Sequence, residues 1–235
     1  CFLSWHVEGG GASAAFLDPS RAQPLWRKKF SPRGGHPAVA VSAAGQGQIV
    51  WFENDGSVQF GAAQVIGGVD GANHACAADI DGDGDNDVVA TSAIVEDVRW
   101  YANDGSGGFG SAQIISPGVD HGKFVSAADM DGDGDIDVLS ASSLDDKIAW
   151  YANDGSGGFG TQQIITTDAD FAQWVGTGDL DGDGDLDVVS TSWYDDKVAW
   201  YTNDGAGGFG PQIILTTSTG ALSEVAAADI DGDGD

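Results

Sequence analysis

The chain repeats itself every 50 residues, and this period constrains its fold more than any other feature. An acidic motif, Asp-x-Asp-Gly-Asp-Gly-Asp, begins at Asp79, Asp129, Asp179 and Asp229. Two further motifs keep almost the same period: an aromatic pair followed by x-Asn-Asp-Gly, and a Phe-Gly followed by an apolar pair. Three motifs that share one period identify a repeat protein, in which each repeat is a structural unit that packs against its neighbours.

Within each repeat, the sequence predicts four short strands joined by turns. In the first clear repeat, residues 87–92 are rich in β-branched residues and bounded by turn residues, and residues 98–102 alternate between two faces. The glycine-rich segment 103–108 predicts a turn, 109–115 a third strand, and 124–129 a fourth strand that leads into the next acidic motif. Four short strands per roughly 50 residues are typical of a β-propeller, so we predict an all-β fold built from four-stranded blades.

The period also divides the chain into a repeat region and an N-terminal flank. We assign residues 38–235 to the β-propeller repeats and residues 1–37 to a non-repeat flank or a degenerate blade, because this flank holds four of the six prolines and five of the nine basic residues. These boundaries give a partial blade at 38–66, blades at about 74–116, 123–166 and 172–215, and a stub at 222–235. The partial blade and the stub either join to close a small four-bladed ring, or the chain is an incomplete ring or a fragment of a larger propeller.

The charge balance argues against two classes of partner. Thirty-seven acidic residues against nine basic ones give a formal net charge of −28, which repels phosphate backbones and anionic lipid. No stretch approaches the roughly 18 consecutive apolar residues that a membrane-spanning helix needs. We therefore expect no nucleic-acid partner and no direct membrane insertion by this chain. No signal peptide is visible at the N-terminus, which opens at Cys1.

The acidic motif predicts a cation site in each repeat. In the copy that starts at Asp79, carboxylates occupy positions 1, 3, 5, 7 and 9 of a nine-residue loop, with glycine at position 6. At an effective dielectric constant near 20, two carboxylates about 5 Å apart repel each other by roughly 3 kcal/mol, so a cation is needed to hold them together. Hard oxygen ligands in a flexible loop favour calcium over zinc or copper, and the glycine lets the chain turn around the ion.

The surroundings of this loop differ from those of an EF-hand. An EF-hand needs a bidentate glutamate at position 12, where the repeats have Ala90, Ser140 and Ser190, and strands instead of helices flank the loop. The aspartate at position 9 must therefore close the ligand shell, and the aspartate at position 7 is expected to ligate through its backbone carbonyl. A solvated acidic turn is the alternative interpretation, and four copies in register favour calcium.

The motif Asp-x-Asp-Gly-Asp-Gly-Asp-x-Asp-Val, with Phe-Gly further along, resembles the FG-GAP or VCBS-type repeat of integrin-α-like β-propellers. The resemblance covers about residues 38–235 and implies blades in which a calcium loop joins the innermost strand to the second. The chain lacks the Gly-Ala-Pro that follows the second strand in that family, and it is too short for the usual seven or so blades. The resemblance implies that the calcium ligands are Asp79, Asp81, Asp83, Asp85, Asp87, Asp129, Asp131, Asp133, Asp135, Asp137, Asp179, Asp181, Asp183, Asp185, Asp187, Asp229, Asp231, Asp233 and Asp235.

Other motifs give no catalytic or nucleotide site. The pattern G-x-G-x-x-G occurs at Gly105, Gly155 and Gly205, but a strand follows it where a dinucleotide-binding fingerprint requires a helix. None of the common hydrolase, metalloprotease or phosphate-binding signatures is present. We therefore expect no enzyme activity.

The aromatic residues fall into a repeated set and a non-repeated set. Trp100, Trp150 and Trp200 follow the period and are expected to pack between blades. Trp174, Trp193 and Tyr194 do not follow it, so they are candidates for stacking on a sugar or a protein partner, with surface packing as the alternative. The lysines of the repeats, Lys123, Lys147 and Lys197, are expected to be solvated edge charges together with the neighbouring aspartates.

These observations predict a calcium-binding β-propeller that acts as a non-catalytic recognition or cell-adhesion module, extracellular or at the cell surface. Millimolar external calcium would fill sites of the affinity common in extracellular modules, about 10⁻⁴–10⁻³ M. The expected partner is a protein or a glycan, bound by loops at one face of the propeller. Two alternatives remain: a glycan-binding lectin or accessory domain of a secreted enzyme, and a structural spacer repeat.

Overall fold

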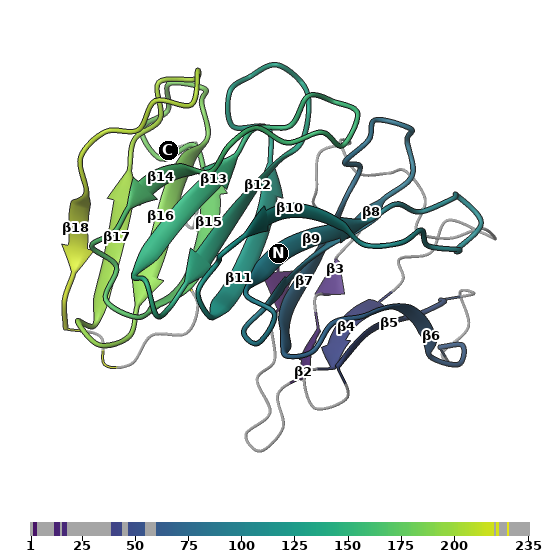
Figure 1. Cartoon of the computed structure of the whole chain (residues 1–235). Helices are drawn as coiled ribbons and strands as arrows, with labels where there is room; N and C mark the ends of the chain where they lie inside the picture. Colours follow the sequence, from purple (N-terminus) through teal and green to yellow (C-terminus); the bar gives the residue numbers. More distant parts are fainter. Residues whose placement is uncertain are drawn as a thin grey trace. The chain divides into compact units, whose positions relative to one another are not determined.

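Every regular element in the described part of the chain is a β-strand, which confirms the all-β prediction (Figure 1). The computed structural model describes residues 2–3, 12–14, 16–17, 39–43, 47–54, 60–218, 220 and 225. The chain divides into two units, Cys1–Gly118 and Val119–Asp235. Within these residues, each unit contains two four-stranded antiparallel sheets.

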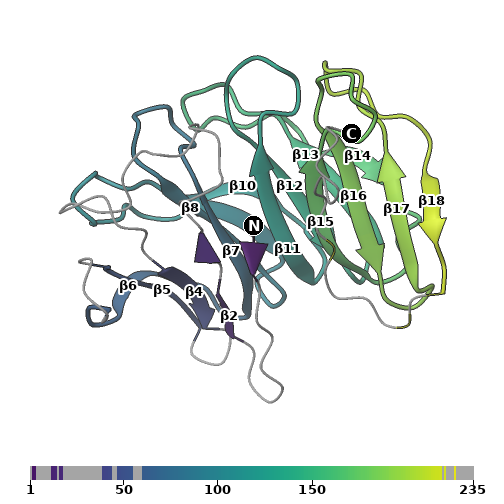
Figure 2. The same ribbon diagram turned by 180° about the vertical axis from the view of Figure 1, so that it is seen from behind.

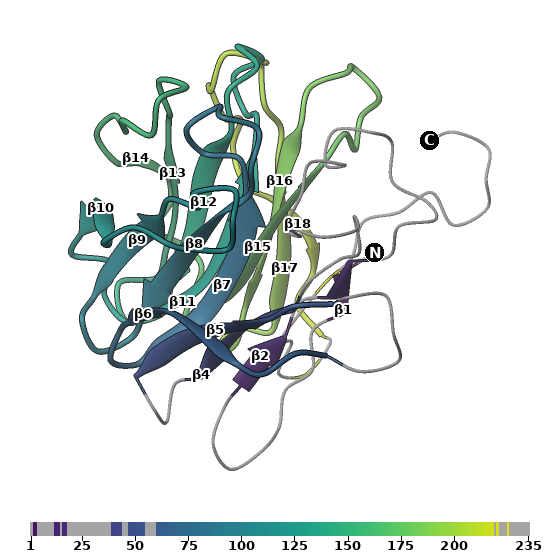
Figure 3. The ribbon, with the colours of Figure 1, turned by 90° about the vertical axis from the view of Figure 1, so that its right-hand side faces the viewer.

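The first unit also contains a short pair of strands near the N-terminus, β1 (Phe2–Leu3) and β3 (Phe16–Leu17). Its first four-stranded sheet has the order β2-β4-β5-β6 (Figure 3). Strand β2, which comes from residues 1–37, pairs with β4 and so adds one strand to those expected within residues 38–66. Its second sheet has the order β7-β8-β9-β10. The strands are β2 (Ala12–Ala14), β4 (Val39–Ala43), β5 (Gln48–Phe52), β6 (Gln64–Gly68), β7 (Ala72–Ala78), β8 (Asp87–Ser92), β9 (Asp97–Tyr101) and β10 (Gln113–Pro117).

The second unit contains two further sheets of the same topology, with the strands in chain order across each sheet. The two sheets lie side by side, and β11 and β15, the first strand of each, contact each other (Figure 2). In every sheet from β7 onward, an acidic loop joins the first strand to the second. The strands are β11 (Gly122–Ala128), β12 (Asp137–Ser142), β13 (Lys147–Tyr151), β14 (Gln163–Thr166), β15 (Ala172–Gly178), β16 (Asp187–Ser192), β17 (Lys197–Tyr201) and β18 (Ile213–Thr216).

The last strand of each sheet begins later than the sequence predicted. Residues 109–115 were expected to form a strand, but the continuous ladder of β10 starts at Gln113. Phe109 forms an isolated bridge with Asn103, and Gly110 N donates a hydrogen bond to the Ala102 carbonyl oxygen at 2.8 Å. Glycine has no side chain to pack and weakens a strand, so the pairing is interrupted between this bridge and the ladder.

The second strand is buried on both faces in the three sheets from β7 onward. All six residues of β8, β12 and β16 are buried, so these strands do not alternate between a buried and an exposed face. In the second unit, Leu139 and Trp150 share an apolar cluster with Val175 and Tyr201 of the other sheet. Such burial is expected where the faces of neighbouring sheets pack together, as they do in a propeller.

The repeated tryptophans pack against the Phe-Gly motif of the next repeat. In the first unit, the ring centroids of Trp51 and Phe109 are 6.5 Å apart with an interplanar angle of 64°, an edge-to-face contact. In the second unit, Trp150 and Phe209 repeat this contact at 6.0 Å and 71°. The prediction that Trp150 packs between blades is therefore confirmed, and Trp100 is also buried.

The prediction that the lysines are solvated is wrong for Lys147 and Lys197. Lys147 Nζ lies 2.7 Å from Asp145 Oδ2, and Lys197 Nζ lies 2.7 Å from Asp195 Oδ2. Both lysine side chains are largely buried in these pairs. Each aspartate precedes its lysine by two residues, so the tight turn between the second and third strands brings the two charges together.

The turn before Phe209 gives a test of this packing. Gly207 has a φ of +76°, and a Cβ at this position would overlap the ring of Trp150. We expect Gly207→Ala to lower the free energy of unfolding by about 2–4 kcal/mol, through backbone strain and overpacking. Gly160→Ala is the matched control, because Gly160 lies in the Phe-Gly motif of the preceding repeat, where a Cβ would make only an ordinary contact with the Ala152 carbonyl oxygen. Urea unfolding measures both variants, and equal stability of the two would contradict the proposed packing.

Candidate metal centre

Three of the four acidic loops lie within the described residues. Residues 79–87 join β7 to β8, residues 129–137 join β11 to β12, and residues 179–187 join β15 to β16. The partial fourth copy, which comprises Asp229, Asp231, Asp233 and Asp235, lies outside the described residues. The three described loops occupy the same place in their sheets, between the first strand and the second.

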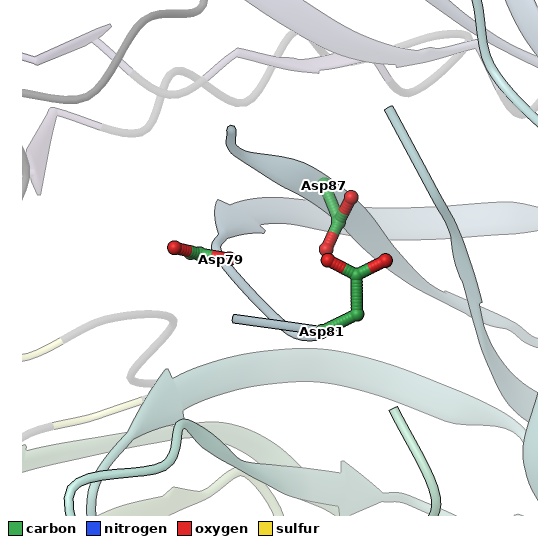
Figure 4. A group of neighbouring side chains, drawn as sticks. All are labelled: Asp79, Asp81 and Asp87. Atoms are coloured by element: carbon green, nitrogen blue, oxygen red, sulfur yellow. The ribbon is translucent and has the colours of Figure 1, made fainter. Parts of the chain in front are cut away.

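Carboxylates converge in each of these loops. In the first, oxygen atoms of Asp79, Asp81 and Asp87 lie within 4.8 Å of one another, and Figure 4 shows the carboxylates of Asp81 and Asp87 facing each other. These are positions 1, 3 and 9 of the motif, and the second loop brings together the same positions. In the third loop the group consists of positions 1, 3 and 5, which are exposed. The other two groups are Asp129, Asp131 and Asp137, and Asp179, Asp181 and Asp183.

The aspartate at position 9 is the buried anchor of each loop. Asp87 is completely buried, and its Oδ2 accepts a hydrogen bond from Ile80 N at 2.9 Å. Its Oδ1 accepts a second hydrogen bond from Asn103 N at 2.8 Å, at the end of the third strand. One carboxylate thus holds the start of the acidic loop and the start of the glycine-rich turn. The same pair of hydrogen bonds is made by Asp137 and Asp187.

The asparagine of the Asn-Asp-Gly motif was not predicted to contribute to the site. Asn103 Nδ2 donates to the Asn86 carbonyl oxygen at 2.9 Å, which fixes the backbone just before position 9. Asn153 and Asn203 make the equivalent bonds, and Asn203 Nδ2 also reaches the Met130 carbonyl oxygen, in the acidic loop of the preceding repeat, at 2.7 Å. The common period of the two motifs was the signal in the sequence that could have linked them.

The aspartates at positions 5 and 7 have different surroundings from the converging carboxylates. At position 5, Asp83 Oδ1 accepts a hydrogen bond from Asp85 N at 2.8 Å, which closes the turn of the loop. At position 7, the carboxylate of Asp85 contacts the backbone of Gly105, where a side chain would overlap it. The same contacts recur in the other loops for Asp133 with Asp135, Asp183 with Asp185, Asp135 with Gly155, and Asp185 with Gly205.

Two carboxylate oxygens of the converging groups have no hydrogen-bond partner although they are buried. These atoms are Asp79 Oδ1 in the first loop and Asp131 Oδ1 in the second. Leaving a buried polar group without a partner costs about 1–3 kcal/mol, and more when the group is charged. An ionised carboxylate has no proton to donate, so the neighbouring aspartates cannot satisfy these buried acceptors while they are charged. A bound cation can satisfy them.

The carboxyl groups show the electrostatic cost of this arrangement in their pKa values. Burial raises the pKa of Asp87 and of Asp137 to about 6, although the hydrogen bonds from backbone amides act in the opposite direction. At position 3, burial and then the neighbouring carboxylates raise the pKa of Asp81 and of Asp131. Without a cation, these groups therefore hold protons more tightly than an isolated aspartate does.

The donor set fits a calcium ion. All the candidate ligands are carboxylate or carbonyl oxygens on a short loop that contains two glycines, which suits a hard cation with flexible coordination. The residues that would hold the ion are those that converge in each loop, with Asp79 Oδ1 and Asp131 Oδ1 as available ligand atoms. A bound divalent cation would neutralise the repulsion among the carboxylates and tie the loop to the second strand.

The family of the chain follows from comparison with known repeats. A family profile described as an FG-GAP-like repeat matches four overlapping segments, residues 35–90, 79–140, 129–190 and 179–235. The chain belongs to the FG-GAP-like repeat family. Adjacent FG-GAP matches overlap at the acidic loops and the strands after them, so the predicted resemblance is confirmed on the residues that suggested it. The four-stranded sheets with a period of about 50 residues also confirm the β-propeller class.

Several solved structures resemble the FG-GAP-like repeats of this chain. A lectin from Agrocybe aegerita, studied for its recognition of non-reducing terminal N-acetylglucosamine, is 23% identical with a TM-score of 0.59, over 82% of this chain and 52% of the lectin. The chain thus spans about half the length of that lectin. A Tc holotoxin pore of Photorhabdus luminescens is 22% identical over 94% of this chain and 11% of that chain, with a TM-score of 0.42. The V. cholerae biofilm matrix protein Bap1 is 18% identical over 74% of this chain and 27% of Bap1, also with a TM-score of 0.42. No curated protein matches the chain in sequence.

The raised pKa values predict a pH dependence of the metal-free protein. Folded Asp87 and Asp137 take up protons near pH 6, whereas an unfolded aspartate does so near pH 4. Their contribution to stability is therefore fully present below about pH 4 and is lost as the pH rises through about 6. We expect the free energy of unfolding, measured in urea after removal of divalent ions, to increase as the pH falls from 7 to 5. Hydrogen bonds lower the pKa of Asp104 and of Asp154, so these groups titrate below this window. A decrease in stability between pH 7 and pH 5 would contradict the expectation.

Proposed function

We propose that this chain is a calcium-stabilised β-propeller segment that acts as a non-catalytic recognition or adhesion module. The observation that carries the calcium assignment is that carboxylates converge in each described loop. In the first two loops the converging group includes a buried oxygen without a hydrogen-bond partner, Asp79 Oδ1 and Asp131 Oδ1. The ion would be structural, because the converging carboxylates belong to loops that join the strands of the sheets. Membership of the FG-GAP-like family supports the same assignment, since repeats of this kind generally bind calcium.

We further propose that the protein acts outside the cell or at its surface. External calcium reaches millimolar levels, which matches the affinity of about 10⁻⁴–10⁻³ M that is common in extracellular calcium modules. The large negative charge of the chain, −28, supports a protein or glycan partner instead of a nucleic acid. In the described residues, no helix is long and apolar enough to cross a membrane.

A glycan-binding lectin, or an accessory domain of a secreted enzyme, is the second candidate function. It is supported by the fold that this chain shares with the Agrocybe aegerita lectin, at a TM-score of 0.59. A fold alone does not fix a ligand, because one fold carries many functions. Binding of a defined glycan by the isolated protein would favour this candidate over a structural spacer.

Calcium should stabilise the protein strongly. At 10 mM calcium and dissociation constants of about 10⁻⁴–10⁻³ M, each filled site adds roughly 1.4–2.7 kcal/mol to the free energy of unfolding. With the three described loops filled, we expect the melting temperature to rise by on the order of 10 °C. Differential scanning calorimetry with calcium, with magnesium, and with sodium at equal ionic strength measures the effect. A melting temperature that is the same in calcium and in chelator would remove the metal assignment.

A single substitution in the second loop should change stability in opposite directions with and without calcium. Asp131→Asn removes one negative charge from a crowded, partly buried site whose pKa is already raised, so it should stabilise the metal-free protein. The same change removes a ligand, so it should reduce the stabilisation produced by calcium.

The matched control for this substitution is Asp168→Asn. Asp168 is an exposed acidic residue in the connection between β14 and β15, away from the converging carboxylates. It loses the same charge without losing a proposed ligand, and its response to calcium should equal that of the wild type. Melting temperatures of the three proteins in chelator and in 10 mM calcium make the comparison. If Asp131→Asn kept the full calcium response, position 3 would not be a ligand.

A further inference from the structure

The second unit exposes an aromatic surface at the end of its sheets opposite the acidic loops. The acidic loop joins the first strand to the second, so the next turn, between the second and third strands, lies at the other end of an antiparallel sheet. The connection that enters the first strand lies at that same end. In the third full repeat these two turns carry Phe171 and the pair Trp193 and Tyr194.

The two turns hold Phe171 and Tyr194 against each other. Their ring centroids are 4.6 Å apart with an interplanar angle of 34°. The backbone fixes this arrangement, because Trp193 N donates to the Phe171 carbonyl oxygen at 3.1 Å and Tyr194 N donates to the Asp170 carbonyl oxygen at 3.2 Å. Tyr194 is nevertheless 67% exposed and Trp193 is 42% exposed. The packing thus creates a fixed aromatic surface that remains open to solvent.

The backbone at Phe171 is in a conformation that is unfavourable for a bulky residue. Its φ is +58°, and the equivalent position of the first full repeat is Gly71, with a φ of +72°. Glycine adopts this conformation without steric cost, whereas a large side chain does so rarely. Two interactions hold Phe171 in place: its N–H donates to Asp146 Oδ1 at 2.9 Å, and Lys123 Nζ lies 5.3 Å from its ring centroid. His121, at the equivalent position of the preceding repeat, has a φ of +55°, so the turn conformation belongs to every full repeat and the third repeat differs in its aromatic ring.

The other repeats do not have aromatic residues at both positions. The position of Tyr194 is occupied by Ile94 and Leu144 in the two preceding repeats, and that of Phe171 by Gly71 and His121. The aromatic pair is therefore not needed to build a blade of this type. In the first full repeat, Ile94 lies directly over Gly71, so these two turns also pack together there, and what the third repeat adds is exposed aromatic rings.

The shape and charge of the surface indicate the chemistry of its ligand. The two rings pack against each other with an interplanar angle of 34° and Tyr194 is largely exposed, so the pair offers an open aromatic face and not the walls of a cage that would enclose an ammonium group. Tyr194 N is hydrogen-bonded to the Asp170 carbonyl oxygen, and Asp195 follows Tyr194 in the sequence. Carboxylates such as these accept hydrogen bonds from hydroxyl groups. Asp195 is already paired with Lys197 and Ser192, which leaves the exposed Asp170 as the freer acceptor. Lys123 and Lys197 also lie at this surface, but Asp146, Asp170 and Asp195 outnumber them, so the local charge disfavours an anionic ligand.

We propose that Phe171, Trp193 and Tyr194 form a binding platform for a neutral saccharide. The apolar C–H face of a pyranose ring stacks on the exposed aromatic face, and its hydroxyl groups donate hydrogen bonds to the carboxylate of Asp170. This inference rests on the recognition function proposed above and names the ligand class and the site. Because the platform and the acidic loops lie at opposite ends of the sheet, the two proposals can fail independently.

The test uses the full chain in 10 mM calcium and a glycan array with glucose, galactose, mannose and N-acetylglucosamine termini, sialylated glycans and an oligolysine peptide. The strongest binder is then titrated by calorimetry against the wild type and Tyr194→Leu. This variant places at position 194 the residue type that the preceding repeat already has at Leu144, so the turn should still fold. We expect binding of at least one neutral glycan, and a loss of affinity of at least tenfold in the variant, which corresponds to about 1.4 kcal/mol.

Leu144→Ala is the control variant, because Leu144 is also exposed and occupies the equivalent turn of the preceding repeat. It should bind the glycan as the wild type does, and both variants should keep the calcium-dependent rise in melting temperature. The proposal is overturned if no neutral glycan binds, if Tyr194→Leu retains full affinity, or if only sialylated glycans or the peptide bind. If glycan binding is absent but calcium still stabilises the protein, the platform is wrong and the metal assignment stands.

Discussion

The buried aspartate at position 9 of each acidic loop is the interaction on which the rest of the repeat depends. In the first full repeat, Asp87 accepts hydrogen bonds from Ile80 N and Asn103 N, so one side chain joins the loop, the second strand and the turn after the third strand. A carboxylate buried in this way is costly unless its charge is compensated. The converging aspartates add to this cost, and a divalent cation is the simplest group that offsets it. The same residue thus links the architecture of the blade to its proposed need for calcium.

Much of the fold could be predicted from the sequence because the period is strict. The strand at residues 87–92 was predicted with its observed bounds, since β-branched residues between turn residues leave few alternatives. The start of the last strand was placed too early, because a bridge between Asn103 and Phe109 followed by glycine resembles a continuous strand in the sequence. A degenerate blade was one interpretation of residues 1–37, but strand β2 could not be located in them because they carry none of the repeated motifs.

The candidate site was predictable in its composition but not in its internal division of roles. A separate role was expected for position 9, but the sequence does not show which other carboxylates converge with it, that Asp85 lies against Gly105, or that Asp87 is buried among backbone amides. Those differences depend on the path of the loop backbone, which positive φ angles at Gly82 and Gly84 determine. The pair formed by Phe171 and Tyr194 likewise joins two turns that are separated in the sequence, and only the three-dimensional structure brings them together.

The pairing of β2 with β4 also has a consequence for the order of folding. Most neighbouring strands of the later sheets are joined by short connections, as in the pairing of Ser140 with Ala149. In the first sheet, Ser13 pairs with Ser42, so a much longer segment must close before this contact can form. Closing a longer loop costs more chain entropy, and non-local pairings slow folding. The hairpins of the later repeats should therefore form early, and the pairing of β2 with β4 at the edge of the first sheet should form last.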